Sequence, residues 1–218
     1  MTQLAPPVEQ SDTLKIVNLC VALLRQPKYI SPWLRQSARL GTPMDLEVPF
    51  FSYAAIDYLR SVLTTDMTVV EYGGGGSTLF FARRVRRVIT IEHDDNWVAD
   101  ISRRLESAQL RNVELIHATA DFSSPTAFGT SAFALAVPSD TQADVVAVDS
   151  YDYFQGHPFR PILFERAKSI VKPGGFVILD DSHRYTRLRH DSGARDVRIF
   201  AGVGPARRPA TCTDIYRF

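Results

Sequence analysis

Residues 69–79 of the chain read VVEYGGGGSTL, and this stretch decides the predicted fold. An apolar run ends at the acidic Glu71, four glycines follow after one tyrosine, and Ser77 and Thr78 precede a helical pattern. Such an order predicts a strand, a tight turn and the start of a helix. Glycines permit positive φ angles and let the backbone approach a ligand closely. Ser77 or Thr78 can cap the next helix, whose N–H groups favour polar or anionic groups. We therefore expect a ligand at this turn.

Strands and helices alternate on the C-terminal side of the glycines. The predicted strands are 68–72, 87–92, 112–117, 143–149 and 176–180, and the predicted helices are 77–84, 96–105 and 161–171. Segment 121–141 is predicted to be mostly loop, with a short element around 132–137. Segments 197–201 and 211–218 suit an antiparallel hairpin at the sheet edge. This pattern predicts an α/β protein with a doubly wound, mostly parallel, seven-stranded Rossmann-like sheet.

Three helical segments precede the glycine turn. Apolar residues recur at helical spacing over 12–24, 31–40 and 49–63. A chain of 218 residues suits one domain. We therefore expect residues 1–48 to form a helical extension that packs on the core domain, residues 49–218, within a single domain overall.

Composition limits the partners of the chain. It is 45% hydrophobic and 22% charged with a net charge of +1, which implies no polyanionic partner such as a nucleic acid. Its two cysteines match no metal-ligand spacing, and its start lacks the pattern of a secretory signal. No apolar run approaches membrane-spanning length. The sequence predicts a cytoplasmic protein with no membrane partner, and it leaves a homo-oligomer open.

Acidic residues follow the predicted strands at matching places. In an open parallel sheet the carboxyl ends of the strands meet at one edge, where ligands bind. This rule places Glu71, Glu92, Asp149, Asp180 and Asp181 on one rim. Glu92 lies about 20 residues past the first glycine, where a carboxylate can accept both ribose hydroxyls of an adenosine.

The glycine turn departs from the dinucleotide fingerprint. That fingerprint requires a third glycine, and Thr78 stands in its place. Glu71 would repel a pyrophosphate but would suit a ligand that carries an ammonium group. S-adenosylmethionine has such a group and no phosphate. A nicotinamide-dependent oxidoreductase of similar fold remains the alternative.

Several motifs of the chain together resemble those of a known protein family. Glu71, Gly73, Gly75 and Ser77, together with Glu92, Asp149 and the Pro173-Gly174-Gly175 turn, are similar to the motifs of class I S-adenosylmethionine-dependent methyltransferases. The resemblance covers residues 50–218. It implies a cofactor site made of the following residues: Glu71, Gly73, Gly74, Gly75, Ser77, Thr78, Glu92, His93, Ala120 and Asp149. Glu71 and the glycine backbone would bind the methionine part, Glu92 the ribose, and His93 and the region of Ala120 the adenine.

The resemblance also bears on catalysis. Asp149 and the pair Asp180-Asp181 are similar to the Mg²⁺ site of catechol-type and sugar O-methyltransferases, and three carboxylates would suit a hard cation. Catechol-type enzymes carry a lysine shortly after the first aspartate, and Asp152 stands there in this chain. In the metal-free alternative, which we favour, His183 is the base, because neutral imidazole is available near pH 7. The catalytic candidates are thus Asp149, Asp181 and His183.

The sequence as a whole predicts a methyltransferase acting on an oxygen or nitrogen of a small molecule. The loop 150–160 carries five aromatic or imidazole side chains and a few polar groups, which suits a small-molecule pocket. A catalytically idle protein that binds S-adenosylmethionine is the alternative from another class. The identity of the methyl acceptor does not follow from the residues.

Overall fold

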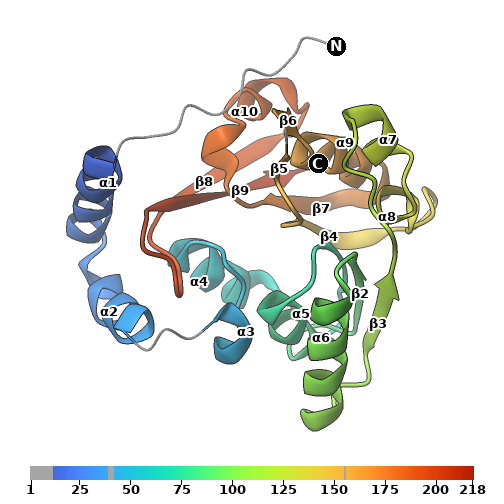
Figure 1. Ribbon diagram of the computed structural model, residues 1–218, viewed down its shortest axis with the longest axis horizontal. Coiled ribbons are helices and arrows are strands. Elements are labelled where there is room, and N and C mark those ends of the chain that lie inside the picture. Colours follow the sequence, from blue (N-terminus) through green and yellow to red (C-terminus); the bar gives the residue numbers. More distant parts are fainter. Residues whose placement is uncertain (1–11, 39–41, 155) are drawn as a thin grey trace.

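The computed structural model describes residues 12–38, 42–154 and 156–218, and nine strands lie in this part of the chain (Figure 1). The strands are β1 (Thr68–Tyr72), β2 (Arg87–Glu92), β3 (Val113–His117), β4 (Ala143–Val148), β5 (Tyr153–Phe154), β6 (His157–Pro158), β7 (Val171–Leu179), β8 (Asp196–Gly202) and β9 (Thr211–Arg217). Seven of them form one sheet in the order β3-β2-β1-β4-β7-β9-β8, and β5 pairs with β6 in a separate hairpin.

Helices precede the sheet and connect its strands. They are α1 (Asp12–Arg25), η1 (Pro27–Tyr29), α2 (Ile30–Ala38), α3 (Pro43–Leu46), α4 (Tyr53–Val62), α5 (Gly76–Ala82), α6 (Asp95–Ser107), α7 (Pro125–Gly129), α8 (Ala132–Leu135), α9 (Arg160–Ile170), η2 (Ser182–Arg184) and α10 (Leu188–Asp191). Within the described ranges, no helix combines the length and the apolar character needed to cross a membrane.

The first five strands of the sheet are parallel, and β9 is antiparallel to both its neighbours. Every residue of β1 is buried, and so are nearly all residues of β4, because helices cover both faces of a parallel sheet. Glu71 in β1 lies beside Thr90 of β2 and Ala147 of β4. This register brings the ends of the three strands to one edge of the sheet.

Two apolar layers cover the faces of the sheet. On one face Val69 and Ile178 pack against Phe80 and Phe81 of α5 and against α4. On the other face the side chains of α7, α8 and α9 pack against alternate strand residues such as Val70. Neighbouring residues of a strand point to opposite faces, which accounts for the two layers.

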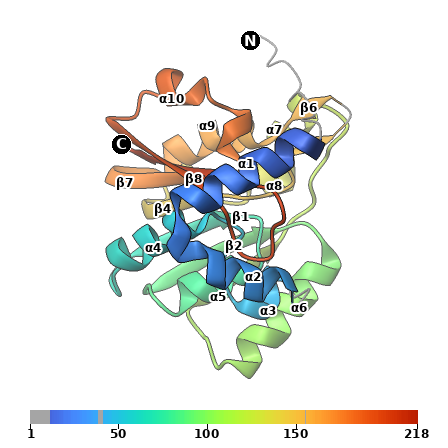
Figure 2. The same ribbon diagram turned by 90° about the vertical axis from the view of Figure 1, so that its left-hand side faces the viewer.

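Helices α1 and α2 lie beside the strands β8 and β9 (Figure 2). The Gln26 amide, just after α1, donates to the Ala201 carbonyl of β8 at 2.9 Å. The Trp33 indole of α2 donates to the Arg207 carbonyl at 2.7 Å. These contacts attach both helices to the sheet edge and to the loop that joins β8 to β9.

The structure confirms the predicted fold class, a mostly parallel seven-stranded sheet with flanking helices. The prediction of loop over most of 121–141 was wrong at 125–129, where α7 forms behind its Ser124 cap. The turn predicted at 173–175 is part of β7, and β5, β6, η2 and α10 were not predicted. The proposed division at residue 48 stays a prediction, and residues 1–11 and 39–41 of the extension lie outside the described residues.

Candidate functional site

The glycine turn joins β1 to α5, and its first position requires glycine. Gly73 has a φ of +91°, and a Cβ there would lie 2.6 Å from the Asp149 carbonyl oxygen. A Cβ on Gly74 would lie 2.6 Å from a methyl carbon of Ile101. At Gly75 the space for a Cβ is open, because this residue borders a cavity. The turn thus packs tightly against the protein interior and leaves its backbone accessible on the side of the cavity.

Glu71 lies beneath the turn and is fully buried. Thr78 Oγ1 donates to Glu71 Oε2 at 2.6 Å, and Thr90 Oγ1 donates to the same oxygen at 3.0 Å. The Gly75 N–H in turn donates to Thr78 Oγ1 at 3.1 Å. Burial raises the pKa of Glu71 to about 7. In the described part of the chain Glu71 Oε1 has no hydrogen-bond partner.

Glu92 holds the other side of the turn. Its Oε2 accepts from the Gly74 N–H at 2.8 Å, and its Oε1 accepts from the N–H groups of His93 and Asp94 at 2.7 and 2.9 Å. Burial opposes the charge of Glu92, but these hydrogen bonds keep its pKa below the usual value. Glu92 is therefore an ionised carboxylate in a fixed position at the end of β2.

The turn borders a cavity of about 260 Å³. Its walls are formed by the following residues: Met44, Val48, Phe50, Gly73, Gly74, Gly75, Gly76, Ser77, Glu92, His93, Trp97, Asp149, Ser150, Tyr151, Arg160 and Arg207. The aromatic rings of Phe50, Trp97 and Tyr151 supply apolar surface. The carboxylates of Glu92 and Asp149 supply hydrogen-bond acceptors, and the glycine backbone supplies polar groups between them.

Two arginines reach the carboxylates at the ends of β4 and β7. Arg160 Nη2 donates to Asp149 Oδ1 at 3.0 Å, and its Nε donates to the Ser150 carbonyl at 2.9 Å. Arg207 Nη2 donates to Asp180 Oδ2 at 2.7 Å, and its Nη1 donates to Asp181 Oδ1 at 2.6 Å. The Arg160 side chain is 7% exposed and the Arg207 side chain 17%.

This cluster shifts the pKa values of its members. Burial and repulsion from Asp180 raise the pKa of Asp149 well above its usual value. Burial raises the pKa of Asp180 to about 6 against the attraction of Arg207. Burial opposes the charge of Asp181 as well, but the guanidinium groups of Arg207 and Arg160 hold its pKa below the usual range. Negative charge therefore concentrates on Asp181, and protons bind more readily to Asp149 and Asp180.

Asp152 contacts the same cluster through Arg160 and is also held by residues 184 and 185. The Tyr185 hydroxyl donates to it, and Arg184 Nη1 donates to Asp152 Oδ2 at 2.9 Å. Arg160 Nε lies 3.8 Å from Asp152 Oδ1. The residue that stands in the place of the catechol-type lysine thus anchors η2 to the loop after β4.

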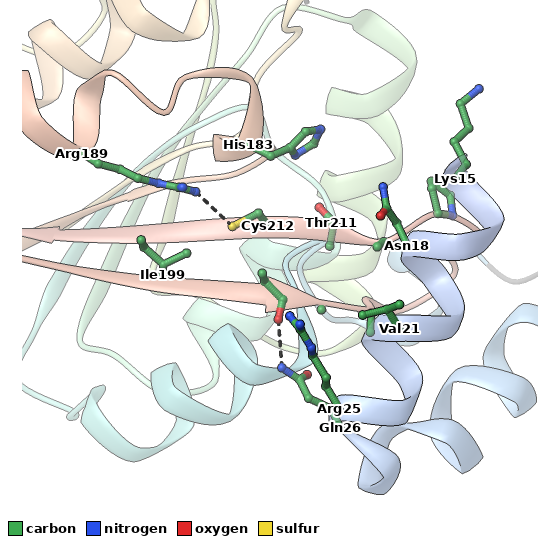
Figure 3. A pocket seen from close by; sticks show the side chains of 15 residues that line it. Lys15, Asn18, Val21, Arg25, Gln26, His183, Arg189, Ile199, Thr211 and Cys212 are labelled. Atoms are coloured by element: carbon green, nitrogen blue, oxygen red, sulfur yellow. Dashed lines mark hydrogen bonds between the residues drawn. The ribbon is translucent and has the colours of Figure 1, made fainter. Parts of the chain in front are cut away.

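His183 lies at a different cavity, of about 370 Å³, between α1 and the strands β8 and β9. Figure 3 shows its ring near Thr211, with Lys15 and Asn18 of α1 opposite. The side chain is exposed at the rim, yet desolvation lowers its pKa despite the attraction of Asp181. His183 does not line the cavity of the glycine turn, so the structure does not gather the three catalytic candidates around one space.

The three aspartates that resemble a Mg²⁺ site do not fit such an ion in this structure. Mg²⁺ requires carboxylate oxygens with free lone pairs at 2.0–2.1 Å. Instead, one oxygen of each aspartate accepts a hydrogen bond from Arg160 or Arg207, and the two guanidinium groups place positive charge where the ion would lie. No group of three or more potential metal-ligating side chains occurs among the residues that the structure describes.

The residues predicted to bind the cofactor fall into two sets. Gly73, Gly74, Gly75, Ser77, Glu92, His93 and Asp149 line one cavity, as the strand-end rule indicates. Glu71 and Thr78 lie beneath the turn and Ala120 is partly buried in the apolar core, so these three do not line it. The cause for Glu71 is strand alternation, which directs its side chain to the face of Val69. Their roles as ligand-binding residues stay predictions.

Arg160 and Arg207 are the site residues that the sequence analysis missed. Arg160 follows an aromatic loop, and Arg207 lies among glycines, prolines and arginines, so neither stands in a recognisable motif. Phe50 and Met44, also in the cavity wall, come from the segment before the sheet. These contacts could not be predicted from the sequence, because they depend on the tertiary structure.

Searches against protein families and curated proteins found no match. Solved structures do match. A methyltransferase from Geobacter sulfurreducens has 18% identity and a TM-score of 0.54, with 97% of this chain and 93% of that chain covered. An rRNA methylase from Streptococcus thermophilus has 16% identity and a TM-score of 0.53, with 76% and 95% covered. A Streptococcus mutans protein described as a methyltransferase and solved with SAH has 12% identity and a TM-score of 0.52, with 76% and 97% covered. The chain therefore has the methyltransferase fold.

Proposed function

We propose that the chain is an S-adenosylmethionine-dependent methyltransferase that acts on an oxygen or nitrogen of a small molecule. One observation carries this proposal: the accessible glycine backbone, the fixed carboxylate of Glu92 and the carboxyl group of Asp149 border one cavity. In the methyltransferase fold such a rim suits the methionine part, the ribose and the reacting end of the cofactor. The fold it shares with a structure solved with SAH supports the same ligand.

The cofactor would lie along the turn. Glu92 would accept hydrogen bonds from the ribose hydroxyls, and Trp97, which is 40% exposed at the cavity, would cover the adenine. His93 packs edge-on against Phe122 and Phe133, so its ring has a fixed position beside that part of the cavity. Phe50 and Tyr151 would bound the space left for the acceptor.

Methyl transfer from a sulfonium is an in-line displacement, so positioning supplies much of the rate. A hydroxyl or amine acceptor must also lose a proton. Asp149 is the catalytic candidate that lines the cavity, and its raised pKa makes the ionised form of its carboxyl group a stronger proton acceptor. We assign the base to Asp149, with Asp181 as the fixed negative charge behind it.

A small-molecule acceptor suits the chain better than a nucleic acid. The net charge is +1, and the cavity wall combines the aromatic rings of Phe50, Trp97 and Tyr151 with polar and charged side chains of both signs, which suits a small polar molecule. Ribosomal RNA methylases share the fold, so RNA is the competing acceptor class. Transfer of radiolabelled methyl groups to small-molecule extracts and to total RNA, compared side by side, separates the two classes.

Calorimetric titration with SAH and with NADH tests the cofactor. We expect SAH to bind and Glu92→Gln to weaken it by about 10- to 100-fold, because a charged hydrogen bond contributes about 1.5–3 kcal/mol. Glu114→Gln is the matched control, since Glu114 is half-exposed and pairs only with Arg87 in the described structure. Binding of NADH without SAH would refute the proposal and favour an oxidoreductase.

A second candidate is a protein that binds S-adenosylmethionine without turning it over. Hydrogen bonds from arginines to the catalytic aspartates favour it, because they engage oxygens that would otherwise accept a proton. SAH binding combined with no methyl transfer to either extract is the result that this candidate predicts.

A further inference from the structure

Arg207 joins two neighbouring carboxylates in the way that a divalent ion does. One guanidinium nitrogen donates to Asp180 and the other to Asp181, at 2.7 and 2.6 Å. The second nitrogen also donates to Thr211 Oγ1 at 2.8 Å. Phe50 covers the outer side, with its ring centroid 5.0 Å from the guanidinium carbon. The group is therefore clamped on both sides in one orientation.

Arg160 completes the positive charge at this place. It donates to Asp149 through Nη2, and its Nη1 lies 3.8 Å from Asp180 Oδ2 and 3.7 Å from Asp181 Oδ2. Two cations thus contact the three aspartates that resemble a Mg²⁺ site. The Arg160 side chain is 93% buried, so water screens its charge little.

Four of the six carboxylate oxygens of these aspartates already accept hydrogen bonds within the described residues. Asp180 accepts through both oxygens, from Arg207 and, at 2.8 Å, from Thr213. Asp181 Oδ1 accepts from Arg207 and Thr211, and Asp149 Oδ1 accepts from Arg160. A divalent ion would have to displace both guanidinium groups, and while they remain it meets repulsion at short range.

We propose that Arg207, supported by Arg160, takes the position of the divalent ion, so that the rim carries a built-in cation and binds no metal. The arginines belong to the same site as the proposed methyl transfer, but the proposal does not depend on it. A direct consequence follows. Removal of Arg207 leaves Asp180 and Asp181 without their main counter-charge, and it opens between them the space and the lone pairs that a divalent ion needs.

The test is Mn²⁺ binding, followed by electron paramagnetic resonance and calorimetry on the full chain. We expect wild-type protein to show no saturable site below about 1 mM, and Arg207→Ala to bind one Mn²⁺ at least about tenfold more tightly. Arg208→Ala is the matched control, because Arg208 is exposed on the same loop and carries the same charge. Adding Asp181→Asn to Arg207→Ala should abolish the new site.

Two results would overturn the proposal. One is a saturable Mn²⁺ site in wild-type protein that Asp181→Asn removes. The other is folded Arg207→Ala, checked by circular dichroism, that gains no Mn²⁺ affinity. Where Arg207→Ala does not fold, Arg207→Gln replaces it. SAH titration of the same samples tests the proposed function separately. If the wild-type protein does not bind SAH, the proposed function is refuted, whereas the Mn²⁺ measurements still decide the inference about Arg207.

Discussion

Replacement of Arg160 by methionine is expected to destabilise the protein strongly and in a pH-dependent way. Methionine keeps much of the side-chain length but removes a charge that four aspartates face within 3.0–3.8 Å. Removal of one partner from a buried ion pair costs about 3–5 kcal/mol, because the remaining charges stay buried. We expect a loss in this range at pH 8.

The sign of the pH dependence follows from the raised pKa values. Asp149 and Asp180 have folded-state pKa values above the usual 3.8, so the folded protein binds more protons than the unfolded chain above that pH. The free energy of unfolding therefore falls as the pH rises toward the folded-state values. Arg160→Met raises these values further. At pH 5, below the pKa of about 6 at Asp180, we expect the loss to shrink to about 1–2 kcal/mol.

Urea denaturation at pH 5 and pH 8 measures this effect. Arg184→Met is the control, since Arg184 is about one-third exposed and pairs with Asp152 at 2.9 Å at the rim. A pair of this kind contributes about 0–1 kcal/mol, with little change between the two pH values. An Arg160→Met loss below about 1 kcal/mol at pH 8, or equal losses at both pH values, would refute the reasoning.

Three further outcomes are expected. In the wild type, the free energy of unfolding should fall by about 3 kcal/mol between pH 4.5 and pH 7, because the Glu71 carboxyl group must ionise while buried. Glu71→Gln should abolish this fall, as measured by urea denaturation at both pH values. Gly73→Ala should cost more than about 3 kcal/mol, since its Cβ meets backbone at 2.6 Å, whereas Gly174→Ala at a φ of +82° in open space should cost only about 1 kcal/mol by thermal melting. A thiol reagent should modify the exposed Cys20 and spare Cys212, which is buried with its pKa raised to about 12, until denaturant is added; reaction of both thiols in the native protein would contradict the burial.

The sheet was predictable from the sequence because its strands are short apolar runs that end at polar residues. The bounds of 68–72 and 87–92 match β1 and β2, since both runs are buried on two sides and neither leaves helix as an alternative. Helix α7 was not predictable in the same way. Five residues behind a serine cap show no apolar periodicity, and the packing of Phe128 against the core decides their conformation.

The rim was predictable only in its acidic half. The strand-end rule depends on topology, so it placed Glu92 and Asp149 correctly at one cavity. It could not place the cations, because Arg207 is separated from Asp180 by 27 residues and reaches it from a loop. His183 shows the opposite error: it is close to Asp181 in sequence, but η2 turns its ring toward the cavity beside α1.

The position of β9 sets the order in which the rim can be completed during synthesis. This strand lies between β7 and β8 in the sheet but follows both in the chain, and the loop before it carries Arg207. A nascent chain that ends at residue 205 would already contain the glycine turn and every aspartate of the rim, but neither the Arg207 charge nor the strand that covers the edge of β7. Self-repulsion among carboxylates and an unpaired edge would coincide in that intermediate. Ribosome-bound chains of increasing length should therefore become protease-resistant only once β9 has emerged.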